Sequence, residues 1–327
     1  MFDGEQVNTK LSHNTSKTIL NFIVNNIFYL VFIGVFVYFS VASSKFCSVS
    51  NLSNLLLQCS YYGILVTGLS FVIISSDFDI SVGAVAYVSM SVGMTAISAG
   101  YPITIGIVLT LMFGTLMGFF NGIVITRLKV PAFIVTLGVL IAGRGIGHLL
   151  VAERGGIPVP TVMTQFTRFK IGPFYYEVII MFLVMAIGQI ILTKTAFGKT
   201  VFAIGDNEKS AEHLGVNIKN MKLLLFTLSG FIASLAGVIY VTQIGYLHAS
   251  FADGWEFTAI SMAVIGGVSL FGGRGTILPG ALLGVVLIVM LQNGLTIIGI
   301  SPYVHPFITG LVIFLAILAD SFKNRYR

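Results

Sequence analysis

Apolar runs of about 20 residues follow one another along almost the whole chain, and this succession constrains the fold more than any other feature. A helix needs roughly 20 mainly apolar residues to cross the hydrocarbon core of a membrane, which is about 30 Å thick. Ten runs qualify: 20–42, 52–74, 81–99, 102–126, 131–151, 174–193, 222–244, 257–271, 277–299 and 303–320. Run 257–271 is short for a regular crossing, so we expect a broken or re-entrant element there, and the region 72–84 is similarly interrupted. The sequence therefore predicts an all-α, polytopic membrane protein of about ten helices.

The composition excludes a water-soluble globular protein. Only 9% of the 327 residues are charged and 56% are hydrophobic, whereas globular chains carry about 25% charged residues. No long polar segment separates two cores, so we expect a single transmembrane domain over 20–320. Cytoplasmic tails are expected at 1–19 and 321–327. The polar start is too long for a cleaved signal peptide, which favours a retained first span. Cys47 and Cys59 have no metal-ligand spacing and suggest no disulfide framework.

The placement of lysine and arginine predicts the orientation of the chain. Cytoplasmic loops of membrane proteins carry an excess of these residues. With an internal N-terminus, most of the 18 basic residues fall on the cytoplasmic side. The four on the outer side are Lys45, Arg154, Arg168 and Lys170, and Arg144 lies within a span. We therefore expect both termini in the cytoplasm. The net charge of +6 reflects this placement, so no nucleic-acid partner is expected.

An internal repeat is suggested by two similar stretches. Asn121–Ile125 is followed by Pro131–Gly138, and Asn293–Ile297 is followed by Pro306–Gly310. In the predicted topology the first stretch turns at the cytoplasmic face and the second at the outer face. This arrangement is typical of the inverted repeats of transporters, in which the pathway lies between the two halves.

A few polar residues interrupt the apolar runs. Asp77 and Asp79 must face an interface, an aqueous cavity or a partner group, because a charge in lipid costs at least a few kcal/mol. Asp79 also suits a cap on the helix that starts near Ser81, which does not exclude a place beside a pathway. Arg144 and His148 share a helix face, and Arg144 is expected to pair with a backbone carbonyl or an acid. Glycines four residues apart are expected to pack helices together; they are Gly114, Gly118, Gly122, Gly280 and Gly284.

The longest predicted cytoplasmic loop, 194–221, contains two candidate features. Gly198-Lys199-Thr200 looks like the end of a phosphate-binding loop, but Thr193 stands where that motif needs glycine and no strand precedes it. We therefore exclude nucleotide binding there. Residues 206–214 are predicted to form a short polar helix ended by Gly215, either as a solvated connector or as a docking helix for a cytoplasmic protein. The glycine cluster 266–275 predicts a tight cytoplasmic turn or unwound backbone at a cavity.

Several short motifs, taken in chain order, resemble the permease subunits of bacterial ABC sugar importers, the ribose, xylose, arabinose and autoinducer-2 group. The hallmark of that family is Gly-Gly-Ile-Asp-Leu-Ser-Val-Gly; Asp79–Gly83 matches it, with Ser76 and Asp77 in place of the two glycines. The other matching positions are Val130–Leu137, Arg144–Gly145, Ala203–Asn207, Gly215–Val216, Ser229–Gly230, Ala233–Gly237, Glu256, Ala259–Ile260, Gly266–Gly267, Ser269–Leu270, Gly272–Gly273, Gly275 and Asn293–Gly294. The resemblance covers roughly residues 45–320 in unbroken order.

The resemblance implies a function and a set of partners. The chain would be a permease of the bacterial inner membrane that moves a small sugar or sugar-like solute. It would pair with a second permease subunit, identical or similar. A cytoplasmic ABC ATPase would bind the ATP, so no cofactor is expected in this chain, and an extracytoplasmic sugar-binding protein would deliver the cargo. The alternatives are an ABC permease for branched-chain amino acids and an ion-coupled secondary transporter. The chain has no cluster of His, Asp or Ser at catalytic spacing, so we do not expect an enzyme.

The expected site residues fall into two groups. The resemblance implies that the loop 205–217 contacts the ATPase, through Gly205, Asp206, Asn207, Ala211 and Gly215. The residues expected at the translocation pathway are Asp79, Ser81, Arg144, Gly266 and Gly267.

Overall fold

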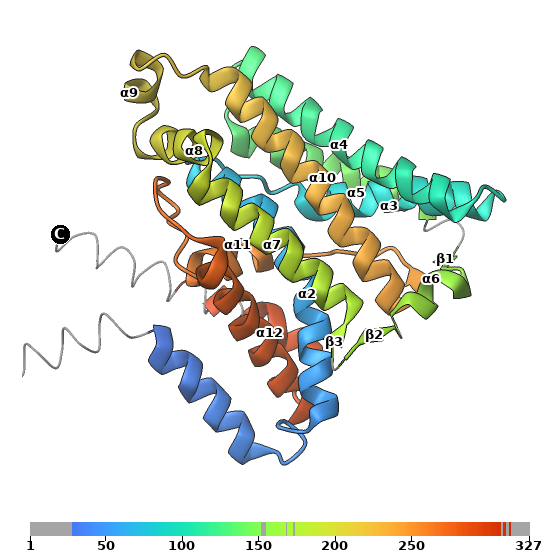
Figure 1. Cartoon of the computed structure of the whole chain (residues 1–327). Coiled ribbons are helices and arrows are strands. Elements are labelled where there is room, and N and C mark those ends of the chain that lie inside the picture. Colours follow the sequence, from blue (N-terminus) through green and yellow to red (C-terminus); the bar gives the residue numbers. More distant parts are fainter. Residues whose placement is uncertain are drawn as a thin grey trace, which may run out of the picture.

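The computed structural model describes residues 28–151, 155–167, 169–172, 174–308, 310, 311 and 314. The predicted tails 1–19 and 321–327, the start of the first predicted run and half of the last lie outside these residues. The helices form one bundle with two distinct ends (Figure 1). Helices α8 (Ala196–Asp206) and α9 (Glu208–His213) lie at one end, and the short strands with α6 (Thr161–Phe166) lie at the other. We call these the α8–α9 end and the strand end.

The predicted spans appear as helices in the described part of the chain. Six helices there are long and apolar enough to cross a membrane. They are α2 (Val49–Ile74), α4 (Ile103–Arg127), α5 (Ala132–Val151), α7 (Tyr176–Lys194), α10 (Ile218–Ile244) and Ile277–Ile297, which comprises η2 (Ile277–Ala281) and α12 (Leu282–Ile297). Shorter apolar helices are Phe28–Ala42, α3 (Val82–Ser98) and α11 (Trp255–Ile265). The chain is thus a mainly helical, multi-pass membrane protein, as predicted.

Small strands amend the all-α prediction at the strand end. β1 (Ile157–Pro158) pairs antiparallel with β4 (Tyr246–Leu247), and β2 (Lys170–Ile171) pairs antiparallel with β3 (Phe174–Tyr175). Each strand has only two residues, too few to give a periodic sequence signal. The Tyr246 hydroxyl donates a 2.6 Å hydrogen bond to the carbonyl of Gly155, which fastens the first pair further.

Helix α2 forms the centre of the bundle, and glycines bring the helices around it close together. α2 is buried along most of its length, whereas less than half of α4, α5 and α7 is buried. Where α4 crosses α10, Gly118 faces Gly230: a Cβ added at Gly118 would lie 3.0 Å from the Gly230 Cα. The glycines thus pack helices, as the sequence predicted. The exposed faces carry large apolar side chains suited to lipid, such as Val108 and Leu183.

Two crossings of the bundle are broken in the same way. After α2 ends, residues 75–81 are non-helical and lead into α3; after α10 ends, residues 248–254 are irregular and lead into α11. The sequence predicted the interruption within 72–84; it also predicted a broken element at 257–271, whereas the irregular residues before α11 lie at 248–254. α11 ends at Ile265, before the predicted end of its run, because Gly266 and Gly267 follow and Gly267 has a φ of 92°. Unwound backbone in a membrane needs hydrogen-bond partners from the protein itself or from water in a cavity.

The α8–α9 end contains the short polar helix predicted within 206–214 and adds a second helix before it. Asn207 caps α9, which is followed by Gly215 with a φ of 87°, and Gly205 and Asp206 end α8. α8 begins because Thr195 has extended backbone angles that end α7, and its hydroxyl accepts a hydrogen bond from the Gly198 N–H. The stretch 196–206 therefore forms a helix where the sequence had suggested a loop.

Candidate functional site

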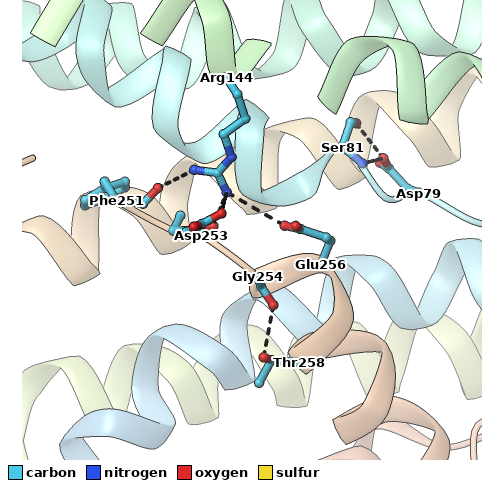
Figure 2. Close-up of polar contacts among 9 residues, drawn as sticks. Asp79, Ser81, Arg144, Phe251, Asp253, Gly254, Glu256 and Thr258 are labelled. Atoms are coloured by element: carbon cyan, nitrogen blue, oxygen red, sulfur yellow. Dashed lines mark hydrogen bonds and ion pairs between the residues drawn. The ribbon is translucent and has the colours of Figure 1, made fainter. Parts of the chain in front are cut away.

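Arg144 of α5 holds the unwound segment 248–254 (Figure 2). Its Nη1 donates a 2.6 Å hydrogen bond to the carbonyl of Phe251, and its Nη2 donates to the carbonyl of Ala252. The Nη2 atom also lies 3.7 Å from Asp253 Oδ1 and 3.8 Å from Glu256 Oε2. The guanidinium group thus has two carbonyls and two acids as partners, the kind of pairing that the sequence favoured for it. A charged donor makes strong hydrogen bonds of this kind, so Arg144 replaces helical hydrogen bonds that the segment lacks.

Helix α3 leaves room for this contact. A Cβ at Gly83 would lie 2.7 Å from the Ala252 carbonyl oxygen and 3.1 Å from Arg144 Nη2, so only glycine fits there without displacement. The ring of Tyr87, one turn further along α3, lies 5.7 Å from the Arg144 Cζ. His148 packs edge-on against the same ring, with 5.7 Å between centroids. The predicted pair Arg144 and His148 therefore meets on Tyr87.

The two acids beside Arg144 differ in exposure. Glu256 is buried, and in the described part of the chain its Oε2 accepts no hydrogen bond. The side chain of Asp253 is 73% exposed. Arg144 lies about 10 Å from Val151 at the end of α5, from a rise of about 1.5 Å per residue. An exposed carboxylate this far inside a span does not face hydrocarbon, because burial of a charge in lipid is costly; it requires water or a polar partner.

Aromatic side chains pack behind the same segment. Tyr61 stacks on Trp255 with 5.1 Å between ring centroids, and Tyr240 lies 5.2 Å from Phe251. Tyr61, Phe251 and Trp255 are all buried. The segment 248–254 is therefore held by Arg144 on one side and by an apolar aromatic cluster on the other.

Asp79 and Ser81 form a separate buried cluster at the start of α3. Asp79 Oδ1 accepts hydrogen bonds from the Ser81 N–H (3.0 Å) and the Ser81 hydroxyl (2.6 Å), and Oδ2 accepts one from Ser229 of α10 at 2.8 Å. Asn121 of α4 donates to the Ser81 hydroxyl at 2.9 Å. The Asp79 carboxylate closes the turn immediately before α3, but the N-cap residue of α3 is Ser81, so Asp79 does not cap the helix as the sequence suggested. All four side chains are buried, so the cluster joins α3, α4 and α10.

Gly266 and Gly267 line a cavity of about 360 Å³ at the end of α11, together with Phe28, Thr276 and Gly280. The glycine-rich loop that follows α11 turns back toward α8. The Gly273 N–H donates a 2.9 Å hydrogen bond to the carbonyl of Ile74. Both sequence interpretations of this loop thus apply, because it makes a tight turn and also leaves unwound backbone beside a cavity. Arg144 and these glycines lie at opposite ends of the crossing 248–267.

The predicted coupling residues lie together at the α8–α9 end, but their exposure differs. Asp206, Asn207 and Gly215 are exposed. Gly205 is buried against the glycine loop, where an added Cβ would clash with Gly273, and Ala211 is buried in a small cluster with Ile204 and Ile218. The buried pair therefore supports the shape of this end, and the exposed three are available for contact.

Sequence reasoning did not single out two features of the site, which are a second ion-pair cluster and the acid Asp253. Lys222 Nζ lies 2.7 Å from Glu208 Oε2 and 3.1 Å from Asp77 Oδ2. The available signal was that Lys222 and Asp77 are opposite charges at the ends of apolar runs. For Asp253, the signal was an acid directly before a short apolar run.

Comparison with known proteins identifies the family. The model of a family described as "Branched-chain amino acid transport system / permease component" matches residues 51–317, most of the chain. The chain belongs to this permease family. The permease is 33% identical to the ribose import permease protein RbsC of Haemophilus influenzae, covering 86% of this chain and 88% of the relative. It is 31% identical to the autoinducer 2 import system permease protein LsrC of Photorhabdus laumondii, covering 86% and 84%.

A third relative is also named as a permease. The permease is 34% identical to the probable ABC transporter permease protein YphD of Escherichia coli, covering 91% of this chain and 90% of the relative. Among solved structures, none matches the permease. The relatives place the permease with the sugar importers of the ABC class, as the motifs indicated. The family is one of transporters rather than an enzyme class.

Proposed function

We propose that the permease is the membrane-spanning subunit of an ABC importer in the bacterial inner membrane, carrying a small sugar or sugar-like solute. An extracytoplasmic binding protein delivers the cargo, and a separate ATPase subunit binds the ATP. The relatives named for ribose and autoinducer-2 import support this proposal. The observation that carries it furthest is the exposed Asp253, held by Arg144 at a break in a crossing. A polar group at this depth suits a pathway for a hydroxyl-rich solute.

The pathway in this proposal follows the broken crossing 248–267. Asp253 and Arg144 offer hydrogen-bonding groups to the cargo near the strand end, and Gly266 and Gly267 lie at the cavity near the other end. Asp79 and Ser81 act beside the pathway, by holding the start of α3. Aromatic and aliphatic groups make up most of the surroundings. A lining with few polar groups binds its cargo weakly enough to release it.

A second permease subunit, identical or similar, covers the exposed face of α5 in this proposal. That face carries Ile134, Leu137, Ile141 and Leu149, with Gly138 leaving open space beside it. It lies on the same helix as Arg144, whose partner Asp253 needs water or a polar partner. A second subunit placed there encloses a polar pathway between the two copies and keeps lipid away from the carboxylate.

The two ends of the bundle suit the two other partners. At the α8–α9 end, the exposed Asp206, Asn207 and Gly215 offer a docking surface for the ATPase. At the strand end, β1, β4 and α6 build an ordered platform for the binding protein. The basic residues of α7, α8, α9 and the start of α10 lie at the α8–α9 end, which supports a cytoplasmic position for it; they are Lys194, Lys199, Lys209, Lys219 and Lys222.

The topology in this proposal has ten spans, an inverted repeat and both termini in the cytoplasm. Its support is the pattern of a long helix, a non-helical segment and a short helix, which occurs as α2, 75–81, α3 and again as α10, 248–254, α11. α2 runs toward the α8–α9 end and α10 runs away from it, so the two units are opposed in direction (Figure 1). Such an arrangement brings two unwound segments into the middle of the membrane.

Transport by reconstituted vesicles tests the proposal. The permease is placed in proteoliposomes with the ATPase and the binding protein encoded beside it, and uptake of radiolabelled ribose, related sugars and leucine is measured. We expect sugar uptake that requires internal ATP and all the partners. Leucine uptake without sugar uptake would favour the branched-chain amino acid alternative, which the family description names. Uptake without ATP that collapses with an ionophore would favour an ion-coupled carrier.

A further inference from the structure

Helix α9 is attached to the bundle through a small cluster of its own. Ala211 of α9 packs with Ile204 of α8 and Ile218 of α10, and this cluster is separate from the main hydrophobic core. Met221 of α10 packs against both this cluster and the main core. The apolar contact of α9 with the core is therefore small, and polar contacts add to it.

The side chain of Lys222 provides such polar contacts. It extends from the second turn of α10 and lies 2.7 Å from Glu208, the first residue of α9, and 3.1 Å from Asp77 in the non-helical segment 75–81. The Lys222 and Asp77 side chains are largely buried. One ammonium group thus joins α9, α10 and the segment that leads into α3.

The segment 75–81 is fastened to α10 at two points. Asp77 pairs with Lys222, and Asp79 accepts a hydrogen bond from Ser229. Lys222 and Ser229 lie about two helical turns apart on one face of α10, or about 10 Å. Ser81, at the end of the segment, is held by Asp79 and by Asn121 of α4. A displacement at Asp77 therefore acts on the start of α3.

We propose that Lys222 is a positioning residue that transmits movement of α9 to the segment 75–81, through its ion pairs with Glu208 and Asp77. The proposal rests on the proposed docking of an ATPase at the α8–α9 end. Through this link, movement driven by the ATPase would reach the segment 75–81 in the first half of the permease.

The test measures the number of sugar molecules imported per ATP hydrolysed, in proteoliposomes that contain the ATPase and the binding protein. Lys222→Met removes both ion pairs, and we expect this ratio to fall about tenfold, with ATP hydrolysis falling much less than uptake. Asp77→Asn keeps the size of the side chain and is expected to lower the ratio about threefold. Lys219→Met is the matched control: Lys219 is an exposed lysine one turn away, and its removal should leave the ratio unchanged.

A variant with all three charges reversed distinguishes a transmitting role of Lys222 from a merely structural one. The variant Asp77→Lys, Lys222→Glu and Glu208→Lys restores opposite charges at all three positions, and we expect it to recover at least half of the wild-type ratio. An unchanged ratio in Asp77→Asn, or a reversed cluster no better than Lys222→Met while present in the membrane, overturns the proposal. Failure of the wild-type permease to retain the ATPase on co-purification would instead overturn the proposed function.

Discussion

At the scale of single residues, Arg144 is the side chain on which most of the candidate site depends. It donates to the carbonyls of Phe251 and Ala252 and lies beside two carboxylates. These partners come from a stretch more than 100 residues away in the chain. Removal of the guanidinium leaves the Phe251 carbonyl without a donor, leaves the Ala252 carbonyl with only a 3.5 Å hydrogen bond from the Trp255 N–H, and leaves the buried Glu256 without its cation.

Replacement of Arg144 by methionine should therefore destabilise the permease strongly. Loss of one member of a buried charge pair typically costs about 3–5 kcal/mol, and we expect Arg144→Met to lower the free energy of unfolding by that amount. Thermal unfolding in detergent, followed by the reactivity of the buried Cys59 thiol, gives the measurement. Arg127→Met removes an exposed arginine from the end of α4 and should change stability by about 0.5 kcal/mol or less. Equal effects of the two changes would contradict the assigned role of Arg144.

At the scale of helices, close contact between α4 and α10 depends on glycine. A Cβ at Gly118 would lie 3.0 Å from the Gly230 Cα and 3.1 Å from its nitrogen. These neighbours are backbone atoms, which cannot rotate away as a side chain can. The two helices must therefore separate when a side chain is added.

Gly118→Ala should destabilise the bundle by about 1–3 kcal/mol, the usual effect of overpacking. Gly34→Ala is the matched control, because nothing lies within 4 Å of a Cβ at that position of the helix Phe28–Ala42. Alanine favours a helix over glycine by up to about 1 kcal/mol, so the control should be neutral or slightly stabilising. The midpoint of thermal unfolding in detergent distinguishes the two. A stable Gly118→Ala variant would show that the α4–α10 contact tolerates separation.

The sequence predicted helices better than the contacts between them. Long apolar runs indicate spans because the thickness of the membrane fixes their length, and α4 and α5 begin and end within one residue of the predicted runs. The helix α8 was missed because it has only 11 residues, too few for a span, and it follows a span directly. The pairing of Arg144 with Asp253 was missed because no local pattern encodes a contact between residues so far apart.

At the scale of the whole molecule, the ends of the bundle should lie on opposite sides of the membrane. Leu214 follows α9 and is exposed at the α8–α9 end, and Tyr101 is exposed at the turn between α3 and α4, at the other end. The proposed topology places Leu214 in the cytoplasm and Tyr101 outside.

Cysteine labelling in whole cells checks this orientation. Each of Leu214→Cys and Tyr101→Cys is made in a Cys47→Ser background, because Cys47 is an exposed native thiol while Cys59 is buried. A membrane-impermeant maleimide should label Tyr101→Cys in intact cells and Leu214→Cys only after permeabilisation. The reverse pattern would invert the topology and would move the proposed ATPase site to the outer face.

The proposed pairing of two subunits through α5 predicts a specific cross-link. Ile141→Cys, on the exposed face of α5, should form a disulfide-linked dimer under mild oxidation in membranes if the partner is a second copy. Ile187→Cys, exposed on α7, is the control for random collision in lipid. With a similar but different partner, the Ile141 variant should give a larger mixed adduct. Equal cross-linking at the two positions would argue against α5 as the interface.

The contact between Arg144 and the segment 248–254 also has a consequence for the biogenesis of the permease. A chain is synthesised from its N-terminus, so α5 enters the membrane well before Phe251 and Ala252 have been made. Until then the guanidinium lacks these acceptors, and a bare charge in hydrocarbon is unfavourable. Stable integration of α5 must therefore wait for the second half of the protein. Nascent chains that stop before residue 245 should leave α5 loosely inserted and open to quality-control proteases.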